Sequence, residues 1–396
     1  MELIVLYSIL IFSVIIILLY AYLIVEKLYE NYKNRKKQKV YKNISGYLDD
    51  IASRIDEYEV TNIQLKTLRG FMKDKIKREI VEERFLFYFE NLKGSILEKL
   101  TKLSEDIGLV DYELEKLKSK DMHKVALACK NLGEIRSKKA IENLIELIDV
   151  EVVEVKYNVL MALAKIGDEE AFIDAFKKLS KTIALSERSL IEIADSFEGD
   201  KIYVYRNLMY LDDEFISSIF IKSAGNYKNT LLADEIAIFL ADENKEKRIA
   251  ALKALGNMGD NRYVVQIIEL LKDEAWEVRA IAAKVLGQLQ DTKALIPLVN
   301  ALSDREWYVR YNAANSLISI EGGIDLVYDV LEGEDRFAKD IVIAVLETSY
   351  GWDKVLQYDM QNTRTPKLKE VIRKYIQEKI GDFYEYTTIK VNSNQF

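Results

Sequence analysis

Few side chains in this sequence have the types and the spacing that catalysis or metal binding requires. Cys129 and His123, the only cysteine and the only histidine, would together form a thiolate–imidazole pair. Six positions along a helix place them about 240° apart, so we expect Cys129 to pack as a small apolar side chain. Phosphate-loop, H-E-x-x-H and EF-hand spacings do not occur. We therefore predict no catalytic, cofactor-binding or metal-binding residues, and no cofactor.

Aromatic side chains offer a different chemistry, the binding of another protein. Trp276 and Trp307 are 31 residues apart, with Tyr308, Tyr311 and Asn312 close to the second one. Tryptophan and tyrosine are enriched among the residues that dominate binding at protein interfaces. The same rings would equally cap an apolar seam between two repeats. The sequence leaves both roles open, and these five residues are the candidate partner-binding residues.

The spacing of 31 residues also applies to charged positions. Three aspartates and three arginines repeat with it: Asp242, Asp273, Asp304, Arg248, Arg279 and Arg310. A fixed period of this length is the signature of a repeat architecture.

Each period contains two apolar stripes at helical spacing. Val264, Ile267, Ile268 and Leu271 fall at i, i+3, i+4 and i+7, which is one face of a helix. A second stripe follows, in which small residues allow close packing: Val278, Ala282, Val285, Leu286 and Leu289. A two-helix unit cannot bury both stripes alone, so successive units must stack. We predict an all-α, right-handed solenoid of about seven repeats over residues 121–350.

These units resemble HEAT repeats, in particular the short variant of the phycobilisome lyases. The residues that match are Asp273, Val278-Arg279, Ala282-Ala283, Leu286-Gly287, Asp291, Pro297 and Leu298. The resemblance is strongest over residues 242–321. It implies that the aspartates and arginines of the 31-residue period form a structural ladder along the stack. Lys156 and Val125 replace the arginine in two earlier units, so the ladder should be interrupted there.

The first 26 residues have the composition of a membrane span. Residues 3–25 contain no charged side chain, and at about 1.5 Å per residue they would cover about 34 Å of a bilayer. Only Glu2 precedes this stretch, and a basic cluster follows it. The positive-inside rule then predicts a single-pass membrane protein with its N-terminus outside and its body in the cytoplasm.

A basic stem at 27–43 follows the expected span. Residues 1–42 contain seven basic and three acidic side chains, whereas the whole chain has a formal charge of -8. Such a stem fits either topology determination or binding to anionic lipid. The acidic remainder argues against nucleic acid as a partner, because phosphate contacts need a basic face.

Residues 44–120 show helical stripes without the 31-residue period. The stretch 92–112 is similar to bacterial membrane-anchored HEAT proteins, some of which accompany membrane glycosyltransferases. After the solenoid, we expect a C-terminal helical cap at 351–381 and a tail at 382–396.

These observations together favour a membrane-anchored scaffold that binds a membrane-associated protein and is not an enzyme. A glycosyltransferase or a polysaccharide-assembly complex is the first candidate partner. Two alternatives remain open: a lyase-like or ligand-binding enzyme built on the solenoid, and an adaptor for anionic lipids.

Overall fold

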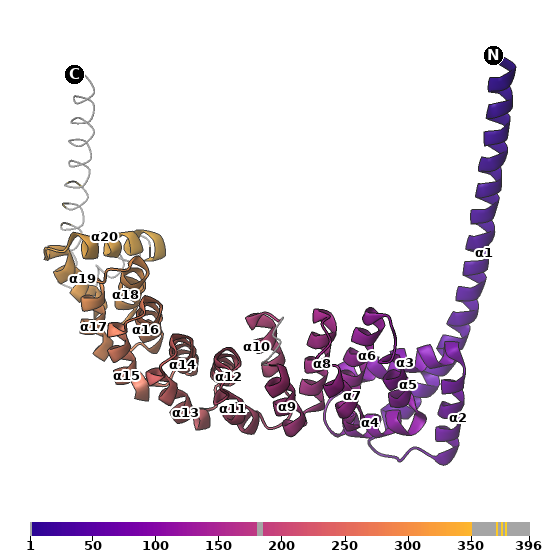
Figure 1. The fold of residues 1–396 in the computed structure, drawn as a ribbon, viewed down its shortest axis with the longest axis horizontal. Coiled ribbons are helices and arrows are strands. Elements are labelled where there is room, and N and C mark those ends of the chain that lie inside the picture. Colours follow the sequence, from indigo (N-terminus) through magenta and orange to yellow (C-terminus); the bar gives the residue numbers. More distant parts are fainter. Residues whose placement is uncertain (1, 180–184, 351–369, 371–373, 375–376, 378–396) are drawn as a thin grey trace. The chain divides into compact units, whose positions relative to one another are not determined.

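The computed structural model describes residues 2–179 and 185–350, together with 370, 374 and 377. The side chains of residues 2–13, 29–37, 39, 349 and 350 are outside this description. The expected cap at 351–381 and tail at 382–396 therefore lie almost wholly outside the described residues. Every element within the described residues is helical (Figure 1). The chain divides into two compact units, residues 1–184 with 196–199, and residues 185–195 with 200–396.

The first unit begins with one long helix, α1, which runs from Glu2 to Arg54. Its C-terminal end packs on α3, where Ile44 and Leu48 are buried. Asp49 of α1 accepts hydrogen bonds from Arg84 and Tyr88 of α3. The other helices of this unit are α2 (Asn62–Lys73), α3 (Lys75–Asn91), α4 (Ser95–Ile107), α5 (Leu109–Lys116), α6 (Met122–Ile135), α7 (Ile141–Glu146), α8 (Val153–Ile166) and α9 (Glu169–Leu179).

The second unit is a solenoid of helix pairs. Its second helices, α12, α14, α16 and α18, follow one another side by side (Figure 1). The first helices α13, α15 and α17 are short, and a 3-10 turn precedes each of them. The helices of this unit are α10 (Glu187–Asp195), α11 (Lys201–Met209), α12 (Glu214–Tyr227), α13 (Ala233–Ile238), α14 (Lys245–Met258), α15 (Val264–Glu269), α16 (Trp276–Leu289), α17 (Leu295–Ala301), α18 (Trp307–Ser319), α19 (Gly323–Glu332) and α20 (Arg336–Val345).

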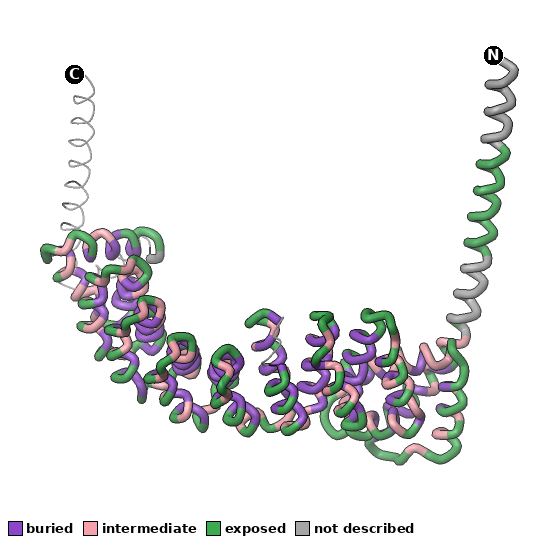
Figure 2. Tube along the Cα trace, viewed as in Figure 1, coloured by how far each residue is buried: buried purple, intermediate pink, exposed green. Residues whose placement is uncertain are grey.

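The two predicted stripes form the core of this solenoid. Val264 and Ile267 are buried on α15 and Leu271 on the 3-10 turn after it, and Val278, Leu286 and their equivalents are buried on the second helices. Buried segments recur along each helix pair, and exposed turns separate them (Figure 2). The all-α solenoid is thus observed in the described residues.

The predicted transmembrane helix is wrong. Among the residues that the structure describes, no helix combines the length and the apolar character that crossing a bilayer requires. The side chains of Val14–Val25 on α1 are exposed, and Glu26-Lys27 follow them. The side chains of residues 3–13 lie outside the described part of the chain.

The single-pass membrane location was derived from that span, and it is wrong for the same reason. A bilayer partner at residues 3–25 and lipid binding by the stem at 27–43 also lack support. In that stem the side chains of residues 29–37 and 39 are not described.

Glycine allows the second helices to approach one another closely. A Cβ on Gly225 of α12 would lie 2.6 Å from the Cβ of Ala254 on α14. One on Gly287 of α16 would lie 2.9 Å from the Cα of Ser316 on α18. Real Cβ atoms do not come this close to other heavy atoms, so any larger residue would push the helices apart.

The substitution Gly287→Ala should lower the free energy of unfolding by about 1–3 kcal/mol, because the added methyl group overpacks the α16–α18 contact. A matched control is Gly70→Ala on α2, where an added Cβ meets nothing within 4 Å. That change should raise stability by about 0.5–1 kcal/mol, since alanine favours a helix. Urea unfolding followed by circular dichroism measures both. Equal effects at the two sites would contradict the close approach.

Candidate functional site

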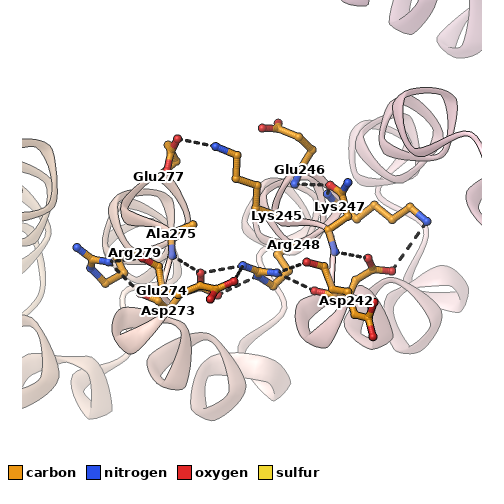
Figure 3. Close-up of polar contacts among 12 residues, drawn as sticks. Asp242, Lys245, Glu246, Lys247, Arg248, Asp273, Glu274, Ala275, Glu277 and Arg279 are labelled. Atoms are coloured by element: carbon orange, nitrogen blue, oxygen red, sulfur yellow. Dashed lines mark hydrogen bonds and ion pairs between the residues drawn. The ribbon is translucent and has the colours of Figure 1, made fainter.

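A ladder of buried arginines connects successive repeats of the second unit (Figure 3). Arg248 on α14 donates from Nη1 to the carbonyl oxygens of Asp242 and Glu243, at 2.8 and 2.9 Å. Its Nη2 donates to Oδ1 of Asp273 in the next repeat, at 2.9 Å. Each guanidinium therefore closes the turn of its own repeat and holds the turn of the following one.

Arg279 repeats this arrangement one period later. Its Nη1 donates to the carbonyl of Asp273, and its Nε and Nη2 donate to the carboxylate of Asp304, at 2.7 and 3.0 Å. Burial opposes the charge on Asp304, but the hydrogen bonds from Arg279 and from the Glu306 amide outweigh it and hold the pKa of this carboxyl below its usual value. The bidentate geometry compensates for burying both charges.

The aspartates of the ladder also fix the start of the second helices. Oδ1 of Asp273 accepts from the amide of Ala275, directly before Trp276, and Oδ1 of Asp304 accepts from Glu306, directly before Trp307. Both distances are 2.8 Å. The ladder therefore determines where the backbone presents the two tryptophans.

Arg310 forms the last arginine step that the structure describes. It donates to the carbonyls of Asp304 and Arg305, and its guanidinium lies 5.4 Å from the ring centre of Phe337. Asp335 stands one period after Asp304, but it caps α20 and accepts from the Ser303 hydroxyl. Asp335 was not among the predicted residues, although its spacing of 31 residues from Asp304 is visible in the sequence.

In the earlier repeats, other residues occupy the position of the ladder arginine. Ser217 on α12 takes the place of the arginine and donates its hydroxyl to the Met209 carbonyl. In the first unit, Lys156 is buried on α8 and Val125 is buried on α6.

The candidate aromatic residues gather at the N-terminal ends of α16 and α18. Trp276 stacks on Tyr308 with ring centres 5.7 Å apart, and Trp307 stacks on Tyr311 at 4.9 Å. Trp307 also meets Tyr308 edge to face, at 5.1 Å. We call these four residues the aromatic edge. They form one continuous cluster that joins two repeats.

The aromatic edge remains accessible. Trp276 is 37% exposed, Trp307 49% and Tyr308 58%. Rings that only sealed a seam would be buried, so these rings both bridge the seam and present a surface. Asn312 lies beside them, but its Nδ2 donates to the Ala280 carbonyl at 2.8 Å, which ties α18 to α16.

The first unit contains a buried charged cluster that sequence reasoning did not find. Lys116 Nζ lies 2.8 Å from Oε1 of Glu82 and 2.7 Å from Oε1 of Glu113. Asn131 donates to both carboxylates, at 3.2 and 3.3 Å. Burial and then the charge of Glu82 raise the pKa of Glu113 to about 7, against the effects of Lys116 and Asn131. These residues come from three helices, α3, α5 and α6, so no pattern within one segment of the sequence predicts the cluster.

The remaining groups with possible chemistry do not form a site among the described residues. Cys129 is buried on α6, and burial raises the pKa of its thiol to about 12, so little thiolate exists at neutral pH. His123 is exposed, with Nδ1 3.2 Å from Glu154. Within residues 2–179 and 185–350, no cluster of histidine, cysteine or acidic side chains fits a metal ion. A cavity of about 500 Å³ beside Tyr58 and Leu103 contains the exposed ion pair Asp56–Lys99.

Comparison with known proteins identifies the repeat type. Residues 233–332 match the family model described as HEAT repeats, which confirms HEAT repeats in this part of the chain. No curated protein matches the chain.

Several solved structures are similar in fold. An engineered protein has 18% identity and a TM-score of 0.33, with 79% of this chain and 98% of that chain covered. A Kap121p mutant has 14% identity and a TM-score of 0.41, with 84% and 38% covered. The CpcE–CpcF complex of phycocyanin lyase from Nostoc sp. PCC7120 has 17% identity and a TM-score of 0.27, with 67% and 94% covered. At these values the likeness gives no argument about function.

The ladder predicts a local loss of stability when one arginine is removed. Arg279→Leu leaves the largely buried carboxylate of Asp304 without its cation, which should cost about 3–5 kcal/mol. Hydrogen exchange of peptides from α16 and α18 measures this loss where it occurs. Arg305→Leu is the control, because Arg305 is exposed on the same turn and should change stability by less than about 0.5 kcal/mol. Similar exchange in both variants would contradict a structural role for the ladder.

The raised pKa of Glu113 predicts that the stability of the protein depends on pH. A carboxyl whose pKa is raised on folding stabilises the protein below its unfolded pKa, and this stability is lost as the pH rises through the folded pKa. The free energy of unfolding should therefore fall between pH 4.5 and pH 7, the ordinary and the folded pKa of Glu113. Glu113→Gln should remove that part of the fall, whereas exposed Glu115→Gln should keep it. Denaturant titrations across this range provide the test, and identical profiles for the two variants would refute the assignment.

Proposed function

We propose that this protein is a repeat scaffold that binds a protein partner through the aromatic edge, and that it acts by binding alone. The observation behind this proposal is the cluster of four stacked rings, Trp276, Tyr308, Trp307 and Tyr311, which is accessible on two consecutive repeats. Large aromatic side chains supply much contact area at interfaces.

The aromatic edge is also preorganised for binding. Its rings hold one another by stacking, and the Asp273 and Asp304 turns hold the backbone beneath them. A surface that is ordered before binding loses little conformational entropy when the partner arrives. This favours a stable docking site over an incidental exposure of apolar side chains.

A more specific proposal concerns which protein the partner is. The likeness of residues 92–112 to HEAT proteins that accompany glycosyltransferases makes a glycosyltransferase or a polysaccharide-assembly protein the first candidate. An enzyme built on the solenoid would instead need a pocket where titratable groups converge. In the described residues, Glu113 and Asp304, which have shifted pKa values, are held in buried ion pairs.

The double variant Trp276→Ala, Trp307→Ala should lose the partner, because it removes the two largest rings of the aromatic edge. Affinity capture from a native extract, followed by mass spectrometry and measurement of stoichiometry, compares it with the unchanged chain. We expect a stoichiometric protein with the unchanged chain and at least a tenfold loss with the variant.

A matched control is Val265→Ala, Ile296→Ala. These residues are also one period apart and exposed, at 57% and 60%, but they lie on the first helices α15 and α17. The control should retain the partner. A partner that survives loss of both tryptophans, or that depends on the control pair instead, would refute binding at the aromatic edge.

A further inference from the structure

A row of lysines crosses the second helices of the solenoid. Lys222, Lys253 and Lys284 stand one period apart on α12, α14 and α16, which pack side by side. Burial lowers the pKa of Lys253, and the charge of Lys222 and then that of Lys284 contribute, while Glu187 and Glu246 oppose the shift. Lys253 is therefore close enough to both neighbouring lysines to experience their charge.

Two of these lysines lack the ion pairs that neighbouring cations have. On the same helices Lys245 pairs with Glu277 at 2.7 Å, and Arg248 and Arg279 pair within the ladder. Lys222 pairs with Glu187 at 2.8 Å. Lys253 and Lys284 each expose surface to solvent, although neighbouring groups partly desolvate the ammonium of Lys253, and neither lysine has an ion pair within the described part of the solenoid. Lys253 and Lys284 therefore present positive charge without an ion pair on a chain whose formal net charge is -8.

A row of amides lies one helical turn beyond the lysines. Asn226, Asn257 and Gln288 follow them by four residues and are exposed. Asn257 Nδ2 donates to Oδ1 of Asn226 at 3.2 Å, and Asn226 Nδ2 donates to Asp195 at 3.0 Å. Because an amide both donates and accepts, such a row can pair with the backbone of an extended peptide.

From these rows we infer that the partner contributes an acidic, extended segment, which crosses α14 and α16 with its carboxylates on Lys253 and Lys284. The inference rests on the proposed function and specifies the chemistry of the partner. The aromatic edge begins on α16, the helix that also holds Lys284, so one partner chain can contact both surfaces.

The geometry also sets the spacing of the acidic residues. Packed helices are about 8–10 Å apart, and a chain extended in the polyproline II conformation advances about 3.1 Å per residue with every third side chain on the same face. Carboxylates at every third position therefore meet successive lysines. A peptide fits this surface better than a nucleic acid does, because the amide row suits a peptide backbone and the uncompensated lysines are only two.

The test uses the full chain and a fluorescein-labelled peptide in which Ser-Thr-Glu is repeated four times. An isomer with the same composition has its four glutamates in succession. Fluorescence anisotropy at 150 mM salt should show tighter binding of the regularly spaced peptide, by about threefold or more. The variant Lys253→Glu, Lys284→Glu should weaken that binding at least tenfold. It should instead bind a peptide in which lysine replaces each glutamate.

The control variant Lys272→Glu, Lys293→Glu makes the same change in net charge at exposed sites on the first-helix side. It should bind the acidic peptide within about twofold of the unchanged chain. Equal losses in the two variants would show a general charge effect and overturn the inference. So would the absence of peptide binding, or tighter binding of a twenty-nucleotide oligothymidine that depends on Lys253 and Lys284.

Failure here is distinguishable from failure of the proposed function. If Lys253→Glu, Lys284→Glu still captures the partner and Trp276→Ala, Trp307→Ala does not, the aromatic edge stands and the acidic segment is refuted. If the tryptophan variant keeps the partner, the proposed function itself fails.

Discussion

The second helices of this solenoid pack more closely than side chains of ordinary size permit, and the other features depend on that contact. Gly225 faces Ala254, and Gly287 faces Ser316, in each case at a distance that leaves no room for a Cβ. The contact recurs with the 31-residue period, so equivalent positions on neighbouring helices lie beside each other. A repeat sequence is thereby converted into rows of like side chains across the stack.

Close packing alone does not fix the register between repeats, because an apolar seam is not directional. The arginine ladder supplies that direction. Arg279 contacts carbonyls of its own turn and the carboxylate of Asp304 one repeat later, so a slip between the repeats would leave two buried charges unpaired. The same carboxylate organises the turn before Trp307. The Arg279–Asp304 interaction thus determines both the register between the repeats and the placement of the aromatic edge.

Much of the solenoid could be predicted from the sequence, because the period repeats each weak signal several times. The apolar stripes, the charged positions and the paired tryptophans were all visible in this way. The cluster of Glu82, Glu113 and Lys116 was not, since only tertiary packing brings Glu82 of α3 to the Glu113–Lys116 pair of α5. The lysine row had a visible spacing, yet only the structure shows that Lys253 lacks the acidic partner that Lys245 has. The membrane prediction rested on the uncharged stretch 3–25 and its flanking charges, and it failed because no helix in the described residues is both long and apolar enough to cross a bilayer.

A strict repeat places like charges side by side unless the fold pairs them with opposite charges. The ladder solves this problem, because each arginine reaches the aspartate of the following repeat and the charges alternate along the stack. In the lysine row, Lys253 experiences the charge of Lys222 and Lys284, and neither Lys253 nor Lys284 has an ion pair in the described part of the solenoid. A carboxylate bound beside Lys253 would offset the charge of its two lysine neighbours, which is the electrostatic complementarity that the inferred acidic segment supplies. Core packing does not require the positive charges of Lys253 and Lys284, whereas binding of an acidic segment does.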